Sequence, residues 1–247
     1  MKIIISPAKK MNIENDVFTH RGFSNFMKET DVLLKEIKKL SYDELKDLWK
    51  CNDKIATLNF ERFSNMDIEK ANTPAILSYE GLQYQNMAPS IFTYDELDYI
   101  EDKLRILSGF YGVLKPFDAV TPYRLEMQGK LVFDKYKDLY DFWDDKLYKE
   151  VIQEDNVILN LASKEYSKTI EKFLNPKDRF VTVVFGELID GKVKQKGTFA
   201  KIARGKMVQY MAKNKLENIE DIKKFNELNL KFSDKFSNYD TFVFIVE

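Results

Sequence analysis

Short β-branched apolar runs recur along this chain and alternate with segments of helical character. The runs that predict strands are KIIIS at residues 2–6, NVILNLAS at 156–163, RFVTVVFGEL at 179–188 and YDTFVFIVE at 239–247. Helices are predicted near residues 24–40, 53–63, 138–153 and 199–214. This interleaving predicts an α/β to α+β fold with a central mixed sheet flanked by helices. Without a linker-like stretch or an internal repeat, residues 1–247 are expected to form one domain.

Turn and cap signals mark the ends of several elements. In GELIDGKVKQKG an Asp-Gly pair between two extended segments predicts a tight hairpin. Ser41 to Glu44 and Thr93 to Glu96 have the spacing of capping boxes at helix starts. We interpret Gly109 as the stop of a helix, because apolar residues recur before it at helical spacing, at Leu97, Ile100, Leu104 and Leu107. Gly112 then allows the chain to reverse into an extended path.

Composition excludes several classes of site. Cys51 and His20 are the sole cysteine and histidine, so an internal disulfide and a Cys/His zinc site are impossible. Any metal would have to bind carboxylates, and we predict neither a metal nor a cofactor. The sequence has no apolar run near the ~20 residues that span a membrane, and no secretory signal. We therefore expect a cytoplasmic protein without membrane contact, and we infer no obligate protein partner.

Charge is unevenly distributed although the formal net charge is only −1. Residues 134–155 hold eight acidic and four basic side chains, whereas residues 190–215 hold one acidic and eight basic side chains. Such a chain can present one positive face, which is all that a polyanion binder needs. Two solvated helix surfaces that complement each other would produce the same counts.

The segment TPYRLEM, residues 121–127, combines apolar and charged residues in strict alternation. If the backbone is extended, Tyr123, Leu125 and Met127 face one way. Arg124 and Glu126 then share the other face. This pattern is typical of a charged site beside a core and equally of a solvated edge strand.

The segment GTFAKIARGKMVQYM, from residue 197, predicts a helix that carries cations. Its apolar stripe would consist of Ala200, Ala203, Met207, Tyr210 and Met211. Lys201 and Arg204 lie one turn apart on a different face. Gly205 costs about 1 kcal/mol relative to alanine inside a helix. Either a phosphate bound beside it or the close approach of another backbone would explain this glycine.

Residues 41–63 predict two helices joined by a short hairpin at residues 51–53. A helix-hairpin-helix element grips a phosphate backbone with hairpin amides and nearby cations, here Lys54 and Arg62. Its usual glycines are replaced by Asn52 and Asp53, and Asp53 would repel phosphate unless it turns inward as a helix cap. An ordinary αα-hairpin is the alternative interpretation.

Two strand ends complete the set of candidate sites. Ser6 and Lys9 follow the first strand at its carboxyl end, where ligands collect in open α/β sheets. Ser163 follows the strand at 156–163 and is the expected N-cap of the next helix.

Five segments together resemble the YaaA family of bacterial peroxide-stress proteins: ISPAK at 5–9, LSGFYGVLKPFD at 107–118, PYRLEM at 122–127, NLAS at 160–163 and KIARG at 201–205. The resemblance covers essentially the whole chain. It implies a cytosolic protein that limits iron-mediated damage by hydrogen peroxide. It also implies a mixed α/β fold with a positively charged cleft and a helix-hairpin-helix element that bind duplex or branched DNA.

The residues and the resemblance together define one candidate cleft. The expected DNA- or phosphate-binding residues are Lys9, Lys54, Arg62, Tyr123, Arg124, Lys201, Arg204 and Lys206. The expected supporting residues are Ser6, Glu126, Asn160, Ser163 and Gly205. Our hypothesis is that Glu126 holds one of the cleft cations in place. The alternative is an enzyme acting on a nucleotide or nucleobase in the same cleft, with Glu126 as general acid or base.

Overall fold

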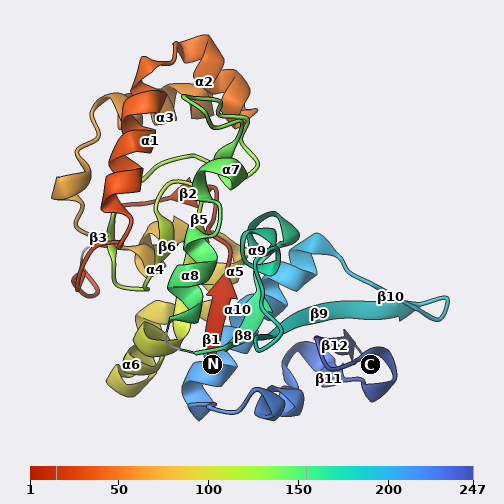
Figure 1. Ribbon diagram of the computed structural model, residues 1–247. Coiled ribbons are helices and arrows are strands. Elements are labelled where there is room, and N and C mark those ends of the chain that lie inside the picture. The colour runs from red at the N-terminus through yellow and green to blue at the C-terminus, as the bar shows by residue number, and fades with distance from the viewer. Residues whose placement is uncertain (15, 154, 247) are drawn as a thin grey trace.

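The computed structural model describes residues 1–14, 16–153 and 155–246 and is built around an eight-stranded sheet (Figure 1). The strand order is β11–β12–β9–β8–β1–β5–β6, with β10 paired to β9. These strands are β1 Lys2–Ile5, β5 Leu104–Ser108, β6 Gly112–Leu114, β8 Val157–Leu161, β9 Arg179–Ile189, β10 Lys192–Lys194, β11 Leu230–Phe232 and β12 Thr241–Val246. Two short pairs lie outside it: β2 Lys10–Met11 with β4 Tyr79–Glu80, and β3 Thr73–Pro74 with β7 Ala119–Val120.

The centre of the sheet is parallel. Strands β5, β1, β8, β9 and β12 run parallel to their neighbours, whereas β6, β10 and β11 pair antiparallel. Every residue of β1 and β5 is buried, as expected for central parallel strands that are covered on both faces. The predicted central mixed sheet is confirmed, and its parallel centre makes the fold α/β.

Helices cover the sheet and form a separate group at one end. The helices are α1 Met27–Lys39, α2 Tyr42–Trp49, α3 Asp53–Ser64, α4 Ala75–Ser78, α5 Leu82–Met87, α6 Tyr94–Lys103, α7 Leu139–Trp143, α8 Lys146–Ile152, α9 Lys164–Glu171 and α10 Gly197–Asn214. Helices α1, α2 and α3 gather at the top of the view, and the β9–β10 hairpin projects to the right (Figure 1). One hydrophobic cluster runs from Met1 to Phe244.

Most local predictions are confirmed. Both capping boxes form in full, at Ser41 and Thr93. Asp190 and Gly191 have positive φ angles of 52° and 73°, which the tight β9–β10 turn requires. The last predicted strand is present to Val246, while Glu247 lies outside the described residues. The helix predicted at 138–153 is divided into α7 and α8, because the backbone at Asp144 adopts a φ of 43°.

The prediction that Gly109 stops a helix is wrong. Helix α6 ends at Lys103, and the residues from Leu104 to Ser108 form the buried strand β5. A strand buried on both faces shows no apolar–polar alternation, so Leu104 and Leu107 continued the helical spacing by coincidence. Gly109 instead lies in the β5–β6 turn, where a Cβ would approach the backbone oxygen of Leu125 to 2.6 Å.

Among the described residues, none of the helices has the length and apolar character of a membrane-spanning segment.

Candidate functional site

A cavity of about 370 Å³ opens beside the carboxyl ends of β1 and β8. Its walls come from five separate parts of the chain: residues 6–10, residues 80–84, residues 123–126, residues 163–166, and two side chains of α10. In an open α/β sheet this edge is where ligands collect, because several loops leave neighbouring parallel strands there. The cavity therefore occupies the position that the sequence predicts for a site.

Two serines join the ends of the parallel strands. Ser6 follows β1, and Ser163 follows β8 at the start of α9. The backbone N–H of Ser163 donates to Ser6 Oγ at 2.8 Å, and Ser6 Oγ donates to Ser163 Oγ at 3.2 Å. Ser163 stands at the predicted N-cap position, but its side chain makes no capping hydrogen bond. Tyr84 Oη fixes the same loop by donating to the carbonyl oxygen of Ser6 at 2.9 Å.

The segment at residues 121–127 has the predicted two-residue alternation. Tyr123, Leu125 and Met127 are buried, whereas Arg124 and Glu126 are only partly buried. Tyr123 anchors the apolar side, since its hydroxyl forms hydrogen bonds with Tyr79 Oη at 2.8 Å and Ser108 Oγ at 2.6 Å. Burial raises the pKa of Tyr123 to about 12. The tyrosine is therefore a neutral anchor that fixes the side of the segment carrying the two charges.

Glu126 holds two cations from distant segments. Its Oε1 accepts a hydrogen bond from Arg124 Nη2 at 3.1 Å, and its Oε2 lies 2.6 Å from Lys9 Nζ. Arg124 Nη2 also approaches the carbonyl oxygen of Trp49, the last residue of α2, at 3.4 Å. The Lys9 side chain stays 63% exposed, whereas the side chain of Arg124 is 11% exposed. Glu126 thus positions Lys9 at the solvent side of the cavity and Arg124 within its wall.

Helix α10 contributes two cations without protein partners. Lys201 is exposed and Arg204 is partly buried, and neither forms an ion pair with any described residue. The Nε of Arg204 is buried without a hydrogen-bond partner, and burial lowers the pKa of Arg204. An unpaired buried cation is costly unless an acceptor joins it. Arg204 therefore presents to the cavity a guanidinium donor that no described residue satisfies.

Cations outnumber anions in the cavity wall. The lining charged residues are Lys9, Lys10, Arg124, Lys201 and Arg204 against Glu80, Glu126 and Glu165. Lys10 Nζ lies 2.7 Å from Glu80 Oε1, so this pair neutralises itself. Burial raises the pKa of Glu165, and the nearby charge of Glu126 adds to that effect.

Other wall residues were missed by sequence reasoning. Gln83 is 6% exposed, and its Nε2 is buried without a hydrogen-bond partner in the described part of the chain. Glu165 Oε1 accepts from the backbone N–H of Gln128 at 3.2 Å. Glu165 had a usable signal, because it stands in the first turn of a helix that follows a predicted strand. Gln83 had none, because α5 is a short helix without a distinctive pattern.

Several predicted site residues do not line the cavity. Arg62 donates to the carbonyl oxygen of Met11 at 3.0 Å, and burial lowers its pKa. Asn160 is buried in β8, and its Nδ2 donates to Thr182 Oγ1 of β9 at 3.2 Å. Lys206 bonds Gln209 Oε1 at 2.9 Å. Lys54 is exposed in the first turn of α3. These four side chains are excluded from the wall because they point to other partners or to solvent.

Gly205 serves helix packing. A Cβ at this position would overlap the backbone oxygen of Gln83 and lie 2.9 Å from the backbone N of Met87, both in α5. Of the two explanations for this glycine, the close approach of another backbone is therefore the one observed. The alternative explanation, a phosphate bound beside Gly205, is wrong, because backbone atoms of α5 occupy that space.

The helix pair α2–α3 has the geometry of an αα-hairpin. The left-handed residue is Lys50, with φ 45°. Asn52 caps α3 by accepting from the backbone N–H of Ile55 at 3.1 Å. Asp53 is therefore not the cap, and its carboxylate lies 2.6 Å from Lys46 Nζ. The use of this hairpin for DNA stays a prediction.

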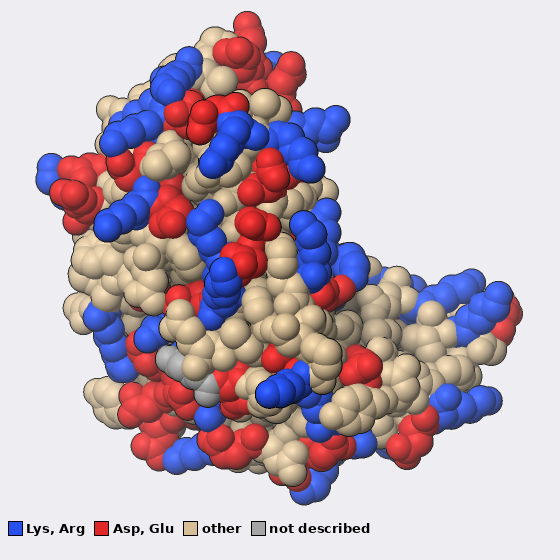
Figure 2. Space-filling view, viewed as in Figure 1, with Lys and Arg blue, Asp and Glu red and all other residues tan. Residues whose placement is uncertain are grey.

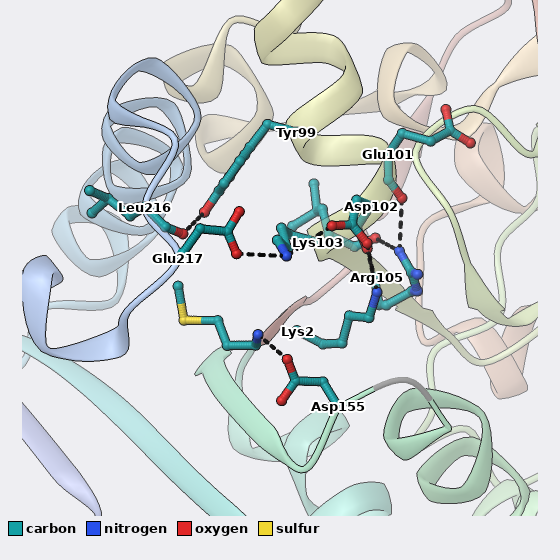
Figure 3. A network of polar contacts seen from close by, with 11 residues as sticks. Lys2, Tyr99, Glu101, Asp102, Lys103, Arg105, Asp155, Leu216 and Glu217 are labelled. Atoms are coloured by element: carbon teal, nitrogen blue, oxygen red, sulfur yellow. Dashed lines mark hydrogen bonds and ion pairs between the residues drawn. The ribbon is translucent and has the colours of Figure 1, made fainter.

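The charges outside the cavity include a paired network at the other end of β1. Over the face shown in Figure 2, basic and acidic side chains are interspersed. At the amino end of β1, Lys2 is buried and its Nζ donates to the backbone oxygen of Asp102 at 2.7 Å and to Asp102 Oδ1 at 3.0 Å (Figure 3). Lys103 Nζ lies 2.9 Å from both Asp102 and Glu217. The two ends of β1 thus differ, with balanced charge at one and excess cation at the other.

Within residues 1–14, 16–153 and 155–246, no cluster of three or more His, Cys, Asp or Glu side chains is placed to hold a metal ion.

Comparison with known proteins identifies the family. Residues 1–236 match the family described as peroxide stress protein YaaA. The chain belongs to this family. It is 52% identical over 245 residues to a UPF0246 protein of Desulfitobacterium hafniense, covering 99% of this chain and 98% of that protein. A UPF0246 protein of Pediococcus pentosaceus is 50% identical with the same coverage, and one of Lactiplantibacillus plantarum is 46% identical over the full length of both chains. The YaaA family resemblance of the sequence is confirmed.

Proposed function

We propose that this YaaA-family protein binds duplex or branched DNA without reading its sequence, through the cations of the cavity, and so limits iron-mediated damage during peroxide stress. We place this activity in the cytoplasm. The observation that carries the proposal is Arg204, one turn from exposed Lys201, whose Nε is buried without a hydrogen-bond acceptor among residues 1–14, 16–153 and 155–246. Phosphate is an anion that arginine binds well, because its oxygens match the geometry of the guanidinium donors.

Lys9 and Arg124 extend the same cationic set. Both are held by Glu126, so they are ordered before a ligand arrives. Together with Lys201 and Arg204 they offer three or four phosphate contacts. Since contacts to phosphate carry no base information, the expected binding is independent of sequence.

A salt titration of duplex binding tests this proposal. Three or four phosphate contacts predict that log K falls with log salt at a slope of roughly −3 to −4. Arg204→Met should weaken binding and reduce that slope while leaving the fold intact, since it removes an unpaired buried charge and keeps the aliphatic length. Lys213→Met is the matched control, because Lys213 is exposed on the same helix outside the cavity. Affinity that does not respond to salt or to Arg204→Met would contradict DNA binding at this site.

Protection from iron chemistry needs its own assay. Supercoiled plasmid treated with ferrous iron and hydrogen peroxide acquires nicks that gel electrophoresis counts. The wild-type protein should reduce nicking in proportion to the DNA that it covers, and Arg204→Met should not. Equal protection by both proteins would mean that any effect on iron damage is independent of the cavity.

The enzymatic alternative has less support from the geometry. Each carboxylate oxygen of Glu126 is engaged with a cation, Arg124 on one side and Lys9 on the other. With both oxygens engaged in this way, the carboxylate suits a positioning role better than proton transfer. Glu126→Gln separates the two functions: DNA retention with loss of turnover of a nucleotide substrate would establish the enzyme.

A further inference from the structure

The cavity has an exposed rim and a buried interior with different chemistry. Lys9, Lys10 and Lys201 are exposed, so a phosphate backbone outside the cavity can reach them. The Nε atoms of Arg124 and Arg204 and the Nε2 atom of Gln83 are buried, and they have no hydrogen-bond partner among the described residues. Buried donors without partners are rare in folded proteins. DNA at the rim can bind the other guanidinium nitrogens of Arg204, but it would leave these three buried donors unsatisfied. A ligand that enters the cavity supplies the acceptors that they lack.

The size of the cavity limits what can enter. A sphere of 370 Å³ is about 9 Å across. The major groove alone, which is only one part of a DNA duplex, is already ~12 Å wide. A double helix therefore stays outside. The volume is at the small end of the ~300–1,000 Å³ typical of small-molecule sites, which suits one nucleotide.

The uncharged wall suits a planar heterocycle. Pro7, Ala8 and Leu82 contribute aliphatic surface, and Tyr84 and Tyr123 contribute aromatic surface. Both tyrosine hydroxyls are already engaged within the protein, Tyr84 with the Ser6 carbonyl oxygen and Tyr123 with Tyr79 and Ser108. These rings therefore offer apolar contact and no free donor. The Gln83 amide is an uncharged wall group whose Nε2 has no partner among the described residues, so it can donate to a ring nitrogen or carbonyl oxygen.

We propose that the cavity binds a single nucleotide unit, with its phosphate at Arg204 and Lys201 and its base against the apolar wall, where Gln83 donates a hydrogen bond to it. This inference rests on the proposed anion-binding role of the cavity and adds the class of ligand. The unit can be a free mononucleotide or an unpaired nucleotide that leaves the stack of a bound DNA. Both sources present the same phosphate and base to the same residues.

The test measures binding of defined probes by calorimetry. The free probes are the four 5′-deoxynucleoside monophosphates, deoxyribose 5-phosphate and inorganic phosphate. The DNA probes are a fully paired duplex and the same duplex with one unpaired nucleotide. Saturable one-site binding of a mononucleotide, tighter than that of deoxyribose 5-phosphate, indicates the free source. Tighter binding of the duplex with the unpaired nucleotide, with no binding of free mononucleotides, indicates the DNA source.

Gln83→Leu removes the unused donor and keeps the side-chain size. It should weaken the nucleotide-dependent binding about tenfold, equivalent to ~1.4 kcal/mol, and leave inorganic phosphate unaffected. Thermal stability should not fall, because an unpartnered buried amide is replaced by an apolar group. Gln85→Leu is the control, since Gln85 is exposed on α5 and outside the wall.

The outcomes separate this inference from the proposed function. If paired duplex still binds in an Arg204-dependent manner while no probe distinguishes Gln83→Leu from wild type, the nucleotide site is refuted and DNA binding stands. If mononucleotides bind and respond to Gln83→Leu while the duplex does not bind, the nucleotide site stands and DNA binding fails. Binding of inorganic phosphate alone overturns the assignment of a nucleotide.

Discussion

Gly205 in α10 lies directly against the backbone carbonyl of Gln83 in α5, with no space for a Cβ between them. Both helices supply cavity residues, Arg204 from α10 and Gln83 from α5. The contact therefore sets the distance between the buried cation and the buried amide donor. A glycine that lowers helix stability here allows two helices of one cavity wall to approach closely.

Gly205→Ala tests this packing. The added methyl group must displace α5, so we expect the free energy of unfolding to fall by about 1–3 kcal/mol, measured by urea denaturation. Gly197→Ala on the same helix is the control, because a Cβ there has no neighbour within 4 Å. Equal stability of the two variants would show that α5 and α10 separate without cost.

The ionisation of Asp118 should destabilise the folded protein, and this penalty should grow as pH rises. Burial raises the pKa of this carboxyl to about 6, although the backbone N–H of Lys115 donates to it. A raised pKa means that the carboxyl favours the fold while protonated and loses that contribution as pH rises from about 4 through 6. Asp118→Asn should therefore raise the free energy of unfolding at pH 7 by up to about 3 kcal/mol. At pH 4 the two proteins should be equal.

Chemical denaturation of Asp118→Asn between pH 4 and pH 7.5 checks this, with Asp190→Asn at the exposed hairpin turn as control. A benefit that is the same at every pH would mean that the ionisation of Asp118 is not its cause.

Asp102 should behave in the opposite way. Partial burial raises its pKa, but hydrogen bonds and charge from Lys103 and Lys2 outweigh this and lower it to about 2. Its stabilising contribution is therefore present above about pH 4 and is lost as pH falls toward 2. Asp102→Asn should lower the urea midpoint at pH 7, and the gap to wild type should close between pH 4 and pH 2. A gap that persists at pH 2 would exclude the ion pairs as its source.

Lys54 tests whether the α2–α3 hairpin contributes to DNA binding. It is exposed in the first turn of α3, and the hairpin reaches the cavity through the contact of Trp49 with Arg124. If Lys54 meets a phosphate, Lys54→Gln should make the slope of log K against log salt shallower by about 0.9. Lys213→Gln should not change it. An unchanged slope for Lys54→Gln would confine DNA contacts to the cavity.

The sequence predicts local geometry well where apolar and polar residues repeat with one clear spacing. The face shared by Arg124 and Glu126 follows from the two-residue repeat of an extended backbone, and the structure shows their ion pair. The same kind of reasoning failed at Leu104 and Leu107, because a strand buried on both faces has no alternation to distinguish it from a helix. It also missed Gln83, whose importance depends on which atoms lie around it.

What the sequence by itself determined was the class of fold, the capped helix starts, the hairpin turn and the alternation at residues 121–127, because each depends on backbone preferences within a few residues. What only the tertiary structure decided was membership of the cavity. Arg204 joined it while Arg62 bonded to Met11, and the backbone carbonyl beside Gly205 decided between the two explanations that the sequence left open for that glycine. Those outcomes depend on contacts between segments far apart in the chain, and no local preference of a residue specifies which distant partner it meets.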